Sequence, residues 1–193
     1  TDSPVPLGFI PEEASSSTAT SSAATDPAAI LRAGGWTKTE SGTWEKEIDK
    51  TKVTLAVAIS TANTPLFDQT ATFIANAWKS IGVDVTVSQF EQTDLVQAVI
   101  RPRDFEALLY GADIGRQADL YPFWHSSQKN DPGLNIAQYT NIDVDALLQK
   151  IRAEQDTAVR TTTIHRIESI IKQEVPAVFL FVPTFGYVVD KSI

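Results

Sequence analysis

The spacing of apolar positions changes three times between residues 53 and 89. Residues 53–60 (VTLAVAIS) are almost continuously apolar, which predicts a strand buried on both faces. Residues 65–81 repeat apolar side chains at helical spacing, and Gly82 follows them, so they predict a helix that ends there. Residues 83–89 (VDVTVSQ) alternate between apolar and polar side chains, which predicts a second strand.

A further helix and strand continue this series. Thr93 or Asp94 is a suitable N-cap for a helix to about Arg101, and residues 105–110 predict a third strand. Strands that alternate with helices indicate an α/β unit with right-handed crossovers.

The residues before this unit predict a short helix and a hairpin. Asp26 is a good N-cap followed by a proline, and the helix that it begins should end at Gly34-Gly35. Residues 36–46 predict a hairpin around Ser41-Gly42, with tryptophans at 36 and 44 as its apolar anchors.

The residues after it are mostly helical. Asn141 predicts the start of a helix over 144–154, and Asp156 that of a longer helix to about residue 174. Pro176 should stop the second helix, and residues 178–182 (VFLFV) predict a final buried strand.

The first 25 residues differ in composition from the rest of the chain. Residues 1–11 contain three prolines, and residues 12–25 are low in complexity and rich in Ser, Thr and Ala. A loop of this length is uncommon inside a compact unit, so we interpret it as a connector.

Composition excludes several classes of protein. The chain has 193 residues, of which 42% are hydrophobic and 21% charged, as in ordinary globular domains. Its net charge is −8 and its basic residues are scattered, so we expect no nucleic-acid binding. There is no Cys for a thiolate metal site, and no apolar run is long enough to span a bilayer. Because Met is also absent and no signal peptide is visible, we expect a processed or excised piece of a longer protein.

Standard catalytic and metal motifs are missing or incomplete. Neither a phosphate-binding loop of the G-x-x-x-x-G-K-[ST] type nor a G-x-S-x-G element occurs. Residues 141–145 begin like a calcium loop, but Ala146 and Arg152 stand where glycine and glutamate are required. His165 is expected to be a surface residue in mid-helix. His125 lies in an aromatic loop, where it has either a structural role or lines a binding surface.

The loop after the third predicted strand carries the strongest functional signal. It combines the aromatic residues Tyr121, Phe123 and Trp124 with the carboxylates Asp113 and Asp119. Ligands of open α/β sheets bind at the carboxyl ends of strands, where this loop starts. The aromatic side chains either contact a ligand or pack as a lid. The two aspartates could also serve as an acid/base pair, but no nucleophile accompanies them, so we expect a binding protein rather than an enzyme and keep a hydrolase as an alternative.

An ordered series of short segments resembles a known family. The segments are residues 30–36 (ILRAGGW), 78–83 (WKSIGV), 103–110 (RDFEALLY), Asp119 with 124–127, 134–135, 139–141, 144–148, 154–156, Arg160 and the stretch from 174 through 181. In this order and spacing the chain resembles the extracellular solute-binding proteins of the peptide/nickel class, the binding subunits of ABC importers for oligopeptides and related solutes.

The resemblance implies one lobe of a two-lobed protein. The expected fold is α/β, a lobe of the periplasmic-binding-protein type II fold with a mixed, mostly parallel sheet and helices on both faces. Residues 1–25 would be a hinge or linker segment, 26–183 the solute-binding lobe, and 184–193 a second hinge crossing to a first lobe missing from this chain.

The resemblance also implies a binding site. In peptide-binding relatives a W-x-x-D segment supplies an aspartate for the α-ammonium group of the peptide, and Tyr110-Gly-Ala-Asp113 matches it with Tyr in place of Trp. The expected ligand-binding residues are Tyr110, Gly111, Asp113, Asp119, Phe123, Trp124, His125 and Asn135. We expect neither a cofactor nor a metal.

The function implied is that of the substrate-binding component of an ABC importer, outside the cytoplasmic membrane. Its partners would be an oligopeptide or related small solute, the permease subunits and the first lobe. The location would be extracellular or periplasmic, with the full-length protein anchored as a lipoprotein. An isolated lobe should bind a ligand weakly or undetectably. The alternative is a stand-alone extracellular module that senses or captures peptides.

Overall fold

The computed structural model describes residues 3–5, 26–115 and 119–183. Most of the predicted connector at 1–25 and the predicted hinge crossing at 184–193 therefore lie outside the described residues. The chain divides into two compact units: residues 16–112, called here the sheet unit, and residues 1–15 with 113–193, called the helical unit. The sequence did not indicate this division.

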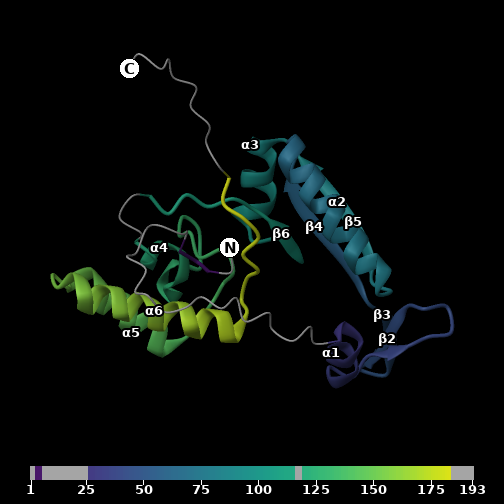
Figure 1. The fold of residues 1–193 in the computed structure, drawn as a ribbon. Coiled ribbons are helices and arrows are strands. Elements are labelled where there is room, and N and C mark those ends of the chain that lie inside the picture. Colours follow the sequence, from purple (N-terminus) through teal and green to yellow (C-terminus); the bar gives the residue numbers. More distant parts are fainter. Residues whose placement is uncertain (1–2, 6–25, 116–118, 184–193) are drawn as a thin grey trace, which may run out of the picture. The chain divides into compact units, whose positions relative to one another are not determined.

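A parallel sheet forms the centre of the sheet unit (Figure 1). Strand β4 (Ala56–Ala62) lies between β5 (Asp84–Phe90) and β6 (Ala107–Leu109), and pairs in parallel with both. Ile59 is opposite Val87 on one side and Ala107 on the other. The strand–helix–strand pattern predicted from the sequence is confirmed.

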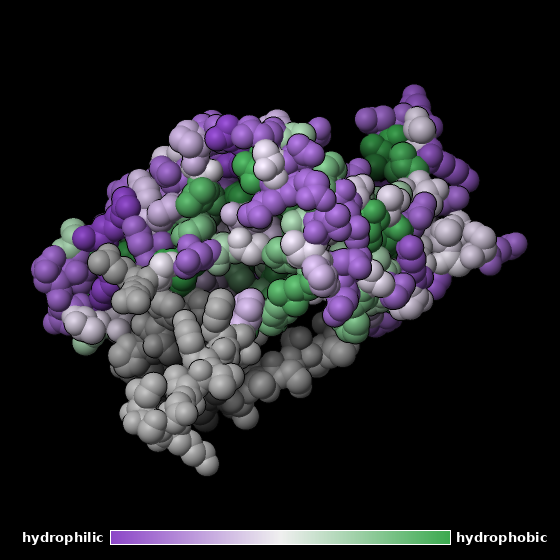
Figure 2. Space-filling view, turned by 90° about the horizontal axis from the view of Figure 1, so that it is seen from above, coloured by the Kyte–Doolittle hydropathy of each residue, from purple (hydrophilic) through white to green (hydrophobic). Residues whose placement is uncertain are grey.

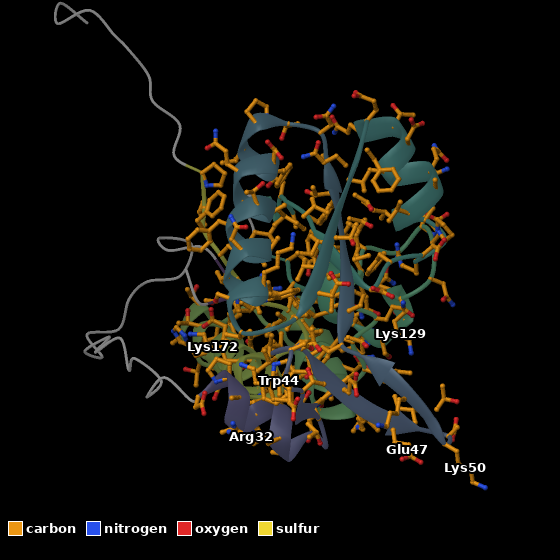
Figure 3. All side chains as sticks on the ribbon, turned by 90° about the vertical axis from the view of Figure 1, so that its right-hand side faces the viewer. Arg32, Trp44, Glu47, Lys50, Lys129 and Lys172 are labelled. Atoms are coloured by element: carbon orange, nitrogen blue, oxygen red, sulfur yellow. The ribbon has the colours of Figure 1, made fainter. Side chains whose placement is uncertain are left out.

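Helices lie on both faces of this sheet, which is the second feature of the expected fold. Helix α2 (Pro65–Ser80) lies on one face, and α3 (Gln92–Asp94) with the π-helical segment η1 (Leu95–Ile100) lies on the other (Figure 3). The core between α2 and the sheet contains Ile59, Ala75, Val83 and Val85, all buried. Burial of this apolar area is the main stabilising contribution of the unit.

The apolar run at residues 53–60 is not one strand. Its first residues belong to β3 (Thr51–Thr54), which pairs antiparallel with β2 (Trp44–Ile48), and its remainder belongs to β4. Leu55 separates the two strands, and its N–H donates to the carbonyl of Trp44 at 2.8 Å. Because the apolar character continues through the change of partner, the pattern alone does not reveal it.

The predicted helix and hairpin are confirmed. Helix α1 (Pro27–Ala33) is capped by Asp26, which accepts a hydrogen bond from the N–H of Ala28 at 3.0 Å. Strand β1 (Thr37–Lys38) pairs with β2, and Trp44 is completely buried between them and the rest of the unit. The Trp44 indole N–H donates to the carbonyl of Ile81 at 2.7 Å, which joins the hairpin to the end of α2.

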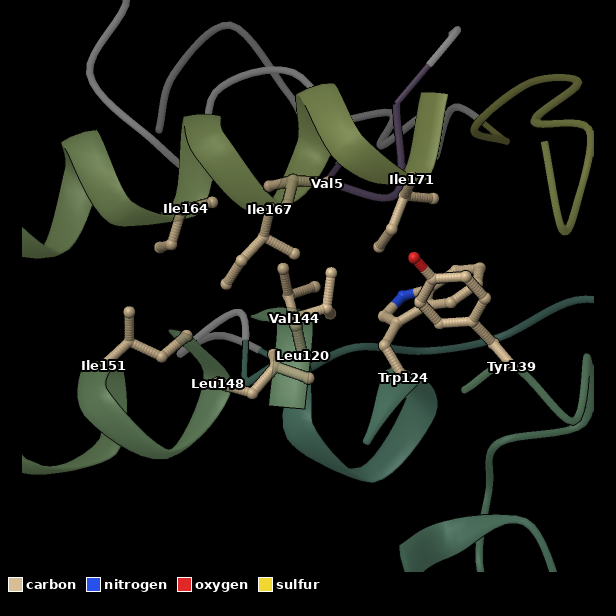
Figure 4. Close-up of a cluster of buried hydrophobic side chains, with 10 residues drawn as sticks. All are labelled: Val5, Leu120, Trp124, Tyr139, Val144, Leu148, Ile151, Ile164, Ile167 and Ile171. Carbon is tan, nitrogen blue, oxygen red and sulfur yellow. The ribbon is translucent and has the colours of Figure 1, made fainter. Parts of the chain in front are cut away.

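The helical unit is built on a helix pair. Helix α5 (Ile142–Ala153) begins at Asn141, and α6 (Thr157–Glu174) begins at Asp156; each cap side chain accepts two backbone N–H groups. The short helices α4 (Tyr121–Trp124) and η2 (Ser126–Gln128) precede them. Figure 4 shows the core that these elements share; its residues are Val5, Leu120, Trp124, Tyr139, Val144, Leu148, Ile151, Ile164, Ile167 and Ile171.

The predicted final strand at 178–182 is wrong. These residues are in no strand, and Val178 is 73% exposed. Only Phe179 and the preceding Ala177 pack against the core. An apolar run needs hydrogen-bonded neighbours to become a buried strand, and the described part of the helical unit has no sheet to supply them.

The surface of the described residues is mixed, with hydrophobic patches separated by hydrophilic side chains on the face shown in Figure 2. No helix in this part of the chain has the length and apolar character to cross a membrane.

Candidate ligand-binding site

Two of the predicted site residues lie at the carboxyl edge of the parallel sheet. Tyr110 and Gly111 directly follow β6, whose neighbour β4 ends at Ala62 on the same edge. The chain leaves β4 toward β5 and then crosses to β6 on the other side, so the strand order reverses beside β4. Ligands of open α/β sheets bind outside such a reversal point.

Hydrogen bonds hold the ends of these strands together. The Thr61 hydroxyl, which is fully buried, donates to the carbonyl of Leu109 at 3.1 Å. The Asn63 amide donates to the carboxylate of Glu91 at 3.1 Å, linking the ends of β4 and β5. Gly111 adjoins the ring of Phe67, which a Cβ atom on the glycine would meet at 3.4 Å. The edge is therefore an organised surface in which Tyr110 and Glu91 stay exposed.

The charge of this edge is negative. The segments that form it, residues 60–70, 88–96 and 109–112, contain Asp68, Glu91 and Asp94 but no Lys or Arg. The next cations along the chain, Lys79 and Arg101, lie where α2 and η1 reach the opposite edge. An edge with this charge attracts a cationic group such as an ammonium.

Asp113 begins the second segment of the helical unit and is exposed. Its Oδ1 accepts the N–H of Gly115 at 2.8 Å, which fixes the carboxylate relative to the backbone. The carboxylate keeps acceptor positions open to solvent, because each ionised oxygen accepts more than one hydrogen bond. Asp113 is thus suited to receive a charged donor.

Asp119 has a different environment. Its Oδ1 accepts the N–H of Tyr121 at 3.1 Å, and its Oδ2 accepts Nε and Nη2 of Arg152 at 3.2 and 2.9 Å. The Arg152 guanidinium lies over the Tyr121 ring, 4.1 Å from its centroid. The Tyr121 ring also stacks on the His125 ring at a centroid distance of 4.1 Å. Asp119 therefore positions a stack of side chains and is already neutralised by a cation.

His125 is 6% exposed, and both ring nitrogens have partners. Nδ1 accepts the N–H of Ser127 at 3.1 Å, and Nε2 lies 3.0 Å from the amide nitrogen of Gln149. Asp145 approaches Nδ1 at 3.9 Å and also accepts the N–H of Ser126 at 2.8 Å. Of the two roles left open by the sequence, the structural one fits these contacts.

Asn135 is fully buried and holds two loop segments together. Its amide donates to the carbonyls of His125 and Tyr139 at 3.1 and 2.9 Å, and its Oδ1 accepts the N–H of Tyr139 at 3.0 Å. Trp124 is 7% exposed and forms edge-to-face contacts with Tyr139 and Phe179 at centroid distances of 6.0 and 5.9 Å. The polar atoms of the Asn135 side chain are therefore used within the loop, and the Trp124 ring packs in the core.

Phe123 is partly buried and packs against the same core. The predicted site residues thus fall into two groups. Tyr110, Gly111 and Asp113 are exposed, whereas Phe123, Trp124, His125 and Asn135 build the loop, and Asp119 anchors it through Arg152. Their role as ligand contacts remains a prediction.

Relatives of known structure cover most of this chain. No family model matches it. The oligopeptide-binding protein AppA of Bacillus subtilis strain 168 is 27% identical over 156 residues, which are 80% of this chain and 28% of AppA. The structure of Bacillus subtilis AppA in complex with a nonapeptide aligns with a TM-score of 0.68 at 26% identity, over 77% of this chain and 29% of that one.

The chain is therefore similar to solute-binding proteins of the peptide/nickel class. A further solute-binding protein shares its fold at lower identity. NikZ of Campylobacter jejuni, solved in complex with Ni(L-His), aligns with a TM-score of 0.64 at 23% identity over 77% of this chain and 29% of NikZ. The expected type II periplasmic-binding-protein fold is confirmed. The chain spans less than a third of the length of these solute-binding proteins.

Sequence reasoning missed two side chains that shape the candidate site. The sequence did not identify Glu91 as a site residue, because it is one polar residue after an alternating strand. The parallel pairing of β4 with β5 brings it beside Asn63. Arg152 was considered only as a misfit in a calcium loop. A cation near the end of a predicted amphipathic helix is a possible signal of an ion pair, and here its partner is Asp119 in the preceding loop.

Proposed function

We propose that this chain is one lobe of the substrate-binding component of an ABC importer, and that the full protein binds an oligopeptide or a related small solute. The observation that carries this proposal is the match to AppA, which extends over 80% of the chain and is supported by an aligned structure that holds a nonapeptide. The bound peptide is observed in that relative, and a peptide ligand for this chain is inferred from the similarity.

The local chemistry supports a peptide ligand. The α-ammonium group of a peptide is a cation, and the carboxyl edge of the sheet unit carries acidic side chains, with no Lys or Arg in the described segments 60–70, 88–96 and 109–112 that form it. Asp113 occupies the position of the aspartate in the W-x-x-D segment, is exposed, and keeps acceptor positions free. A charge-assisted hydrogen bond between such a carboxylate and an ammonium is among the stronger polar contacts in proteins.

The remaining parts of the proposal rest on the same similarity to AppA. The full protein acts outside the cytoplasmic membrane, in an extracellular or periplasmic position, and a lipid anchor retains it there. Its partners are the permease subunits and a first lobe, which closes on the ligand by hinge bending.

We infer that the function is binding and not catalysis. The relatives are named as binding proteins. The hydrolase alternative needs Asp113 and Asp119 as a pair with different protonation states, but Asp119 is held as a partner of Arg152.

Calorimetry with the longest natural protein that contains this chain tests the proposal. A pool of tri- to nonapeptides with free N-termini should bind, and the same peptides with acetylated N-termini should bind more weakly. Asp113→Asn should weaken binding of the free peptides by roughly 10- to 150-fold, since a hydrogen bond to a charged group contributes about 1.5–3 kcal/mol. Its effect on the acetylated peptides should be small.

Asp49→Asn is the matched control, because Asp49 is exposed at a hairpin turn with φ of 48°, a conformation that Asn tolerates. It should leave both affinities unchanged. Equal binding of free and acetylated peptides by the wild-type protein would refute recognition of the ammonium, and absence of binding to every peptide would refute the proposed ligand class.

A further inference from the structure

A groove runs along the side of the α5–α6 pair in the helical unit. Its volume is about 390 Å³. Helix α5 contributes Leu147 and Lys150, and α6 contributes the rest of its lining: Ala158, Val159, Thr162, Thr163 and Arg166. None of the residues discussed above as ligand contacts belongs to this lining, so the groove is separate from the candidate binding site.

The floor of the groove is more apolar than its sequence suggests. The Thr162 hydroxyl donates to the carbonyl of Ala158 at 3.0 Å, and the Thr163 hydroxyl donates to that of Val159 at 2.8 Å. Both threonine hydroxyls are therefore used by the helix, which leaves the methyl group of the exposed Thr162 as contact surface, while Thr163 is buried. Val159 is 38% exposed and Leu147 is partly buried, so these residues extend the apolar strip.

Two cations line the same groove. Lys150 and Arg166 form no salt bridge with any described residue, and the groove lining contains no carboxylate. Other cations of the same unit are paired, as Arg152 is with Asp119. In a chain with net charge −8, two unpaired cations beside an apolar strip form a local positive surface.

We propose that this groove is a docking surface for an acidic segment of a partner protein. An apolar side chain of the segment lies on the strip formed by Leu147 and Val159, and carboxylates on either side of it pair with Lys150 and Arg166. The complementarity is specific, because an apolar segment without acidic groups gains nothing from the cations. This inference does not depend on the proposed peptide-import function.

A synthetic acidic peptide tests it directly. The probe is a fluorescein-labelled hexapeptide of alternating Glu and Leu, compared with one of alternating Gln and Leu, and binding is followed by fluorescence anisotropy. The Glu peptide should bind about 5-fold or more tightly than the Gln peptide, because two exposed ion pairs each contribute up to about 5-fold in affinity. The difference should shrink as salt is raised.

Variants locate the site. The double variant Lys150→Glu with Arg166→Glu should abolish the preference for the Glu peptide. Lys52→Glu, an exposed charge reversal on β3 of the sheet unit, is the matched control and should retain it. In amide NMR spectra the Glu peptide should shift resonances of residues 147–166 in the wild-type chain, and circular dichroism should show that each variant keeps its helical content.

Four results would overturn the proposal. Equal binding of the two peptides would show that the cations take no part, and an equal loss in the Lys52→Glu control would show that only net charge matters. Binding to phosphatidylglycerol vesicles with no binding to the Glu peptide would assign the surface to lipid. A dimer in sedimentation that the double variant dissociates would assign it to a second copy of the chain.

Discussion

Replacing Asn135 by alanine tests whether this side chain stabilises the loop or serves as a ligand contact. The side chain is fully buried and makes three hydrogen bonds, to the carbonyls of His125 and Tyr139 and from the N–H of Tyr139. Alanine removes all three, so the N–H and C=O of Tyr139 lose this partner, while the His125 carbonyl keeps the N–H of Gln128 at 3.0 Å. At a net value of about 1 kcal/mol for each hydrogen bond, the free energy of unfolding should fall by about 3 kcal/mol.

This loss is large compared with the roughly 5–15 kcal/mol by which natural domains are stable. Urea unfolding followed by circular dichroism measures the change. Circular dichroism averages over both units, and tryptophan fluorescence would report mainly on the sheet unit, which holds three of the four tryptophans. Amide hydrogen exchange of α5 and α6 is therefore used to assign the loss to the helical unit. Faster exchange should appear there and not in β4 or β5.

Asn130→Ala is the control, since Asn130 is exposed in the same loop and its substitution should change stability by less than about 0.5 kcal/mol. If Asn135→Ala leaves the unfolding free energy within the range of the Asn130→Ala control, the three hydrogen bonds do not stabilise the loop. Asn135 would then return to the set of ligand contacts that the family resemblance implies.

Three further substitutions test particular contacts. Burial and the adjacent Glu174 carboxylate raise the pKa of Tyr139 above its ordinary value of 10.0. Because the folded state disfavours the phenolate, the free energy of unfolding should fall as pH rises above 10. Tyr139→Phe should flatten that fall in urea unfolding measured from pH 8 to 11. Gly82→Ala places a Cβ 2.1 Å from the carbonyl oxygen of Gly42 at a φ of 98°, so thermal unfolding should show a loss of about 2 kcal/mol or more, and an unchanged melting temperature would contradict the close approach. Trp124→Ala should cost about 3–5 kcal/mol as a large-to-small core change, whereas a loss below about 1 kcal/mol in urea unfolding would mean that the side chain is a surface ligand contact.

Local signals predicted most of the elements correctly. Asp26, Asn141 and Asp156 each accept the backbone N–H groups expected of an N-cap, and the helices begin where these residues stand. Capping depends on residues within one turn of each other, so the sequence contains nearly all the information needed. The parallel sheet was also predictable, because alternating strands and helices have few other arrangements.

Elements that depend on distant partners were harder to predict. The run at 53–60 changes sheets at Leu55, and the run at 178–182 forms no strand, although both are strongly apolar. The hydrophobicity of a segment predicts that it is buried, but it does not predict which strand supplies its hydrogen bonds. A strand therefore cannot be assigned from composition when its neighbour is unknown.

The candidate site shows the same limit at the level of side chains. The loop at 110–127 was recognised as rich in aromatic and acidic residues, yet Trp124 and His125 are buried within it, and Tyr110 and Asp113 are exposed. Trp, His and Tyr occur both in cores and in binding sites, so their presence in a loop does not separate the two roles. Only the contacts of the folded loop, such as the Arg152 that neutralises Asp119, separate the two roles.

Titration calorimetry of oligopeptides against the longest natural protein that contains this chain, alongside the 193-residue chain itself, tests the central claim most directly. The full protein should bind a peptide with one-to-one stoichiometry, and the isolated chain should bind it weakly or undetectably because it offers one lobe. Tight peptide binding by the isolated chain, or none by the full protein, would contradict the assignment of this chain as one lobe of an oligopeptide-binding protein.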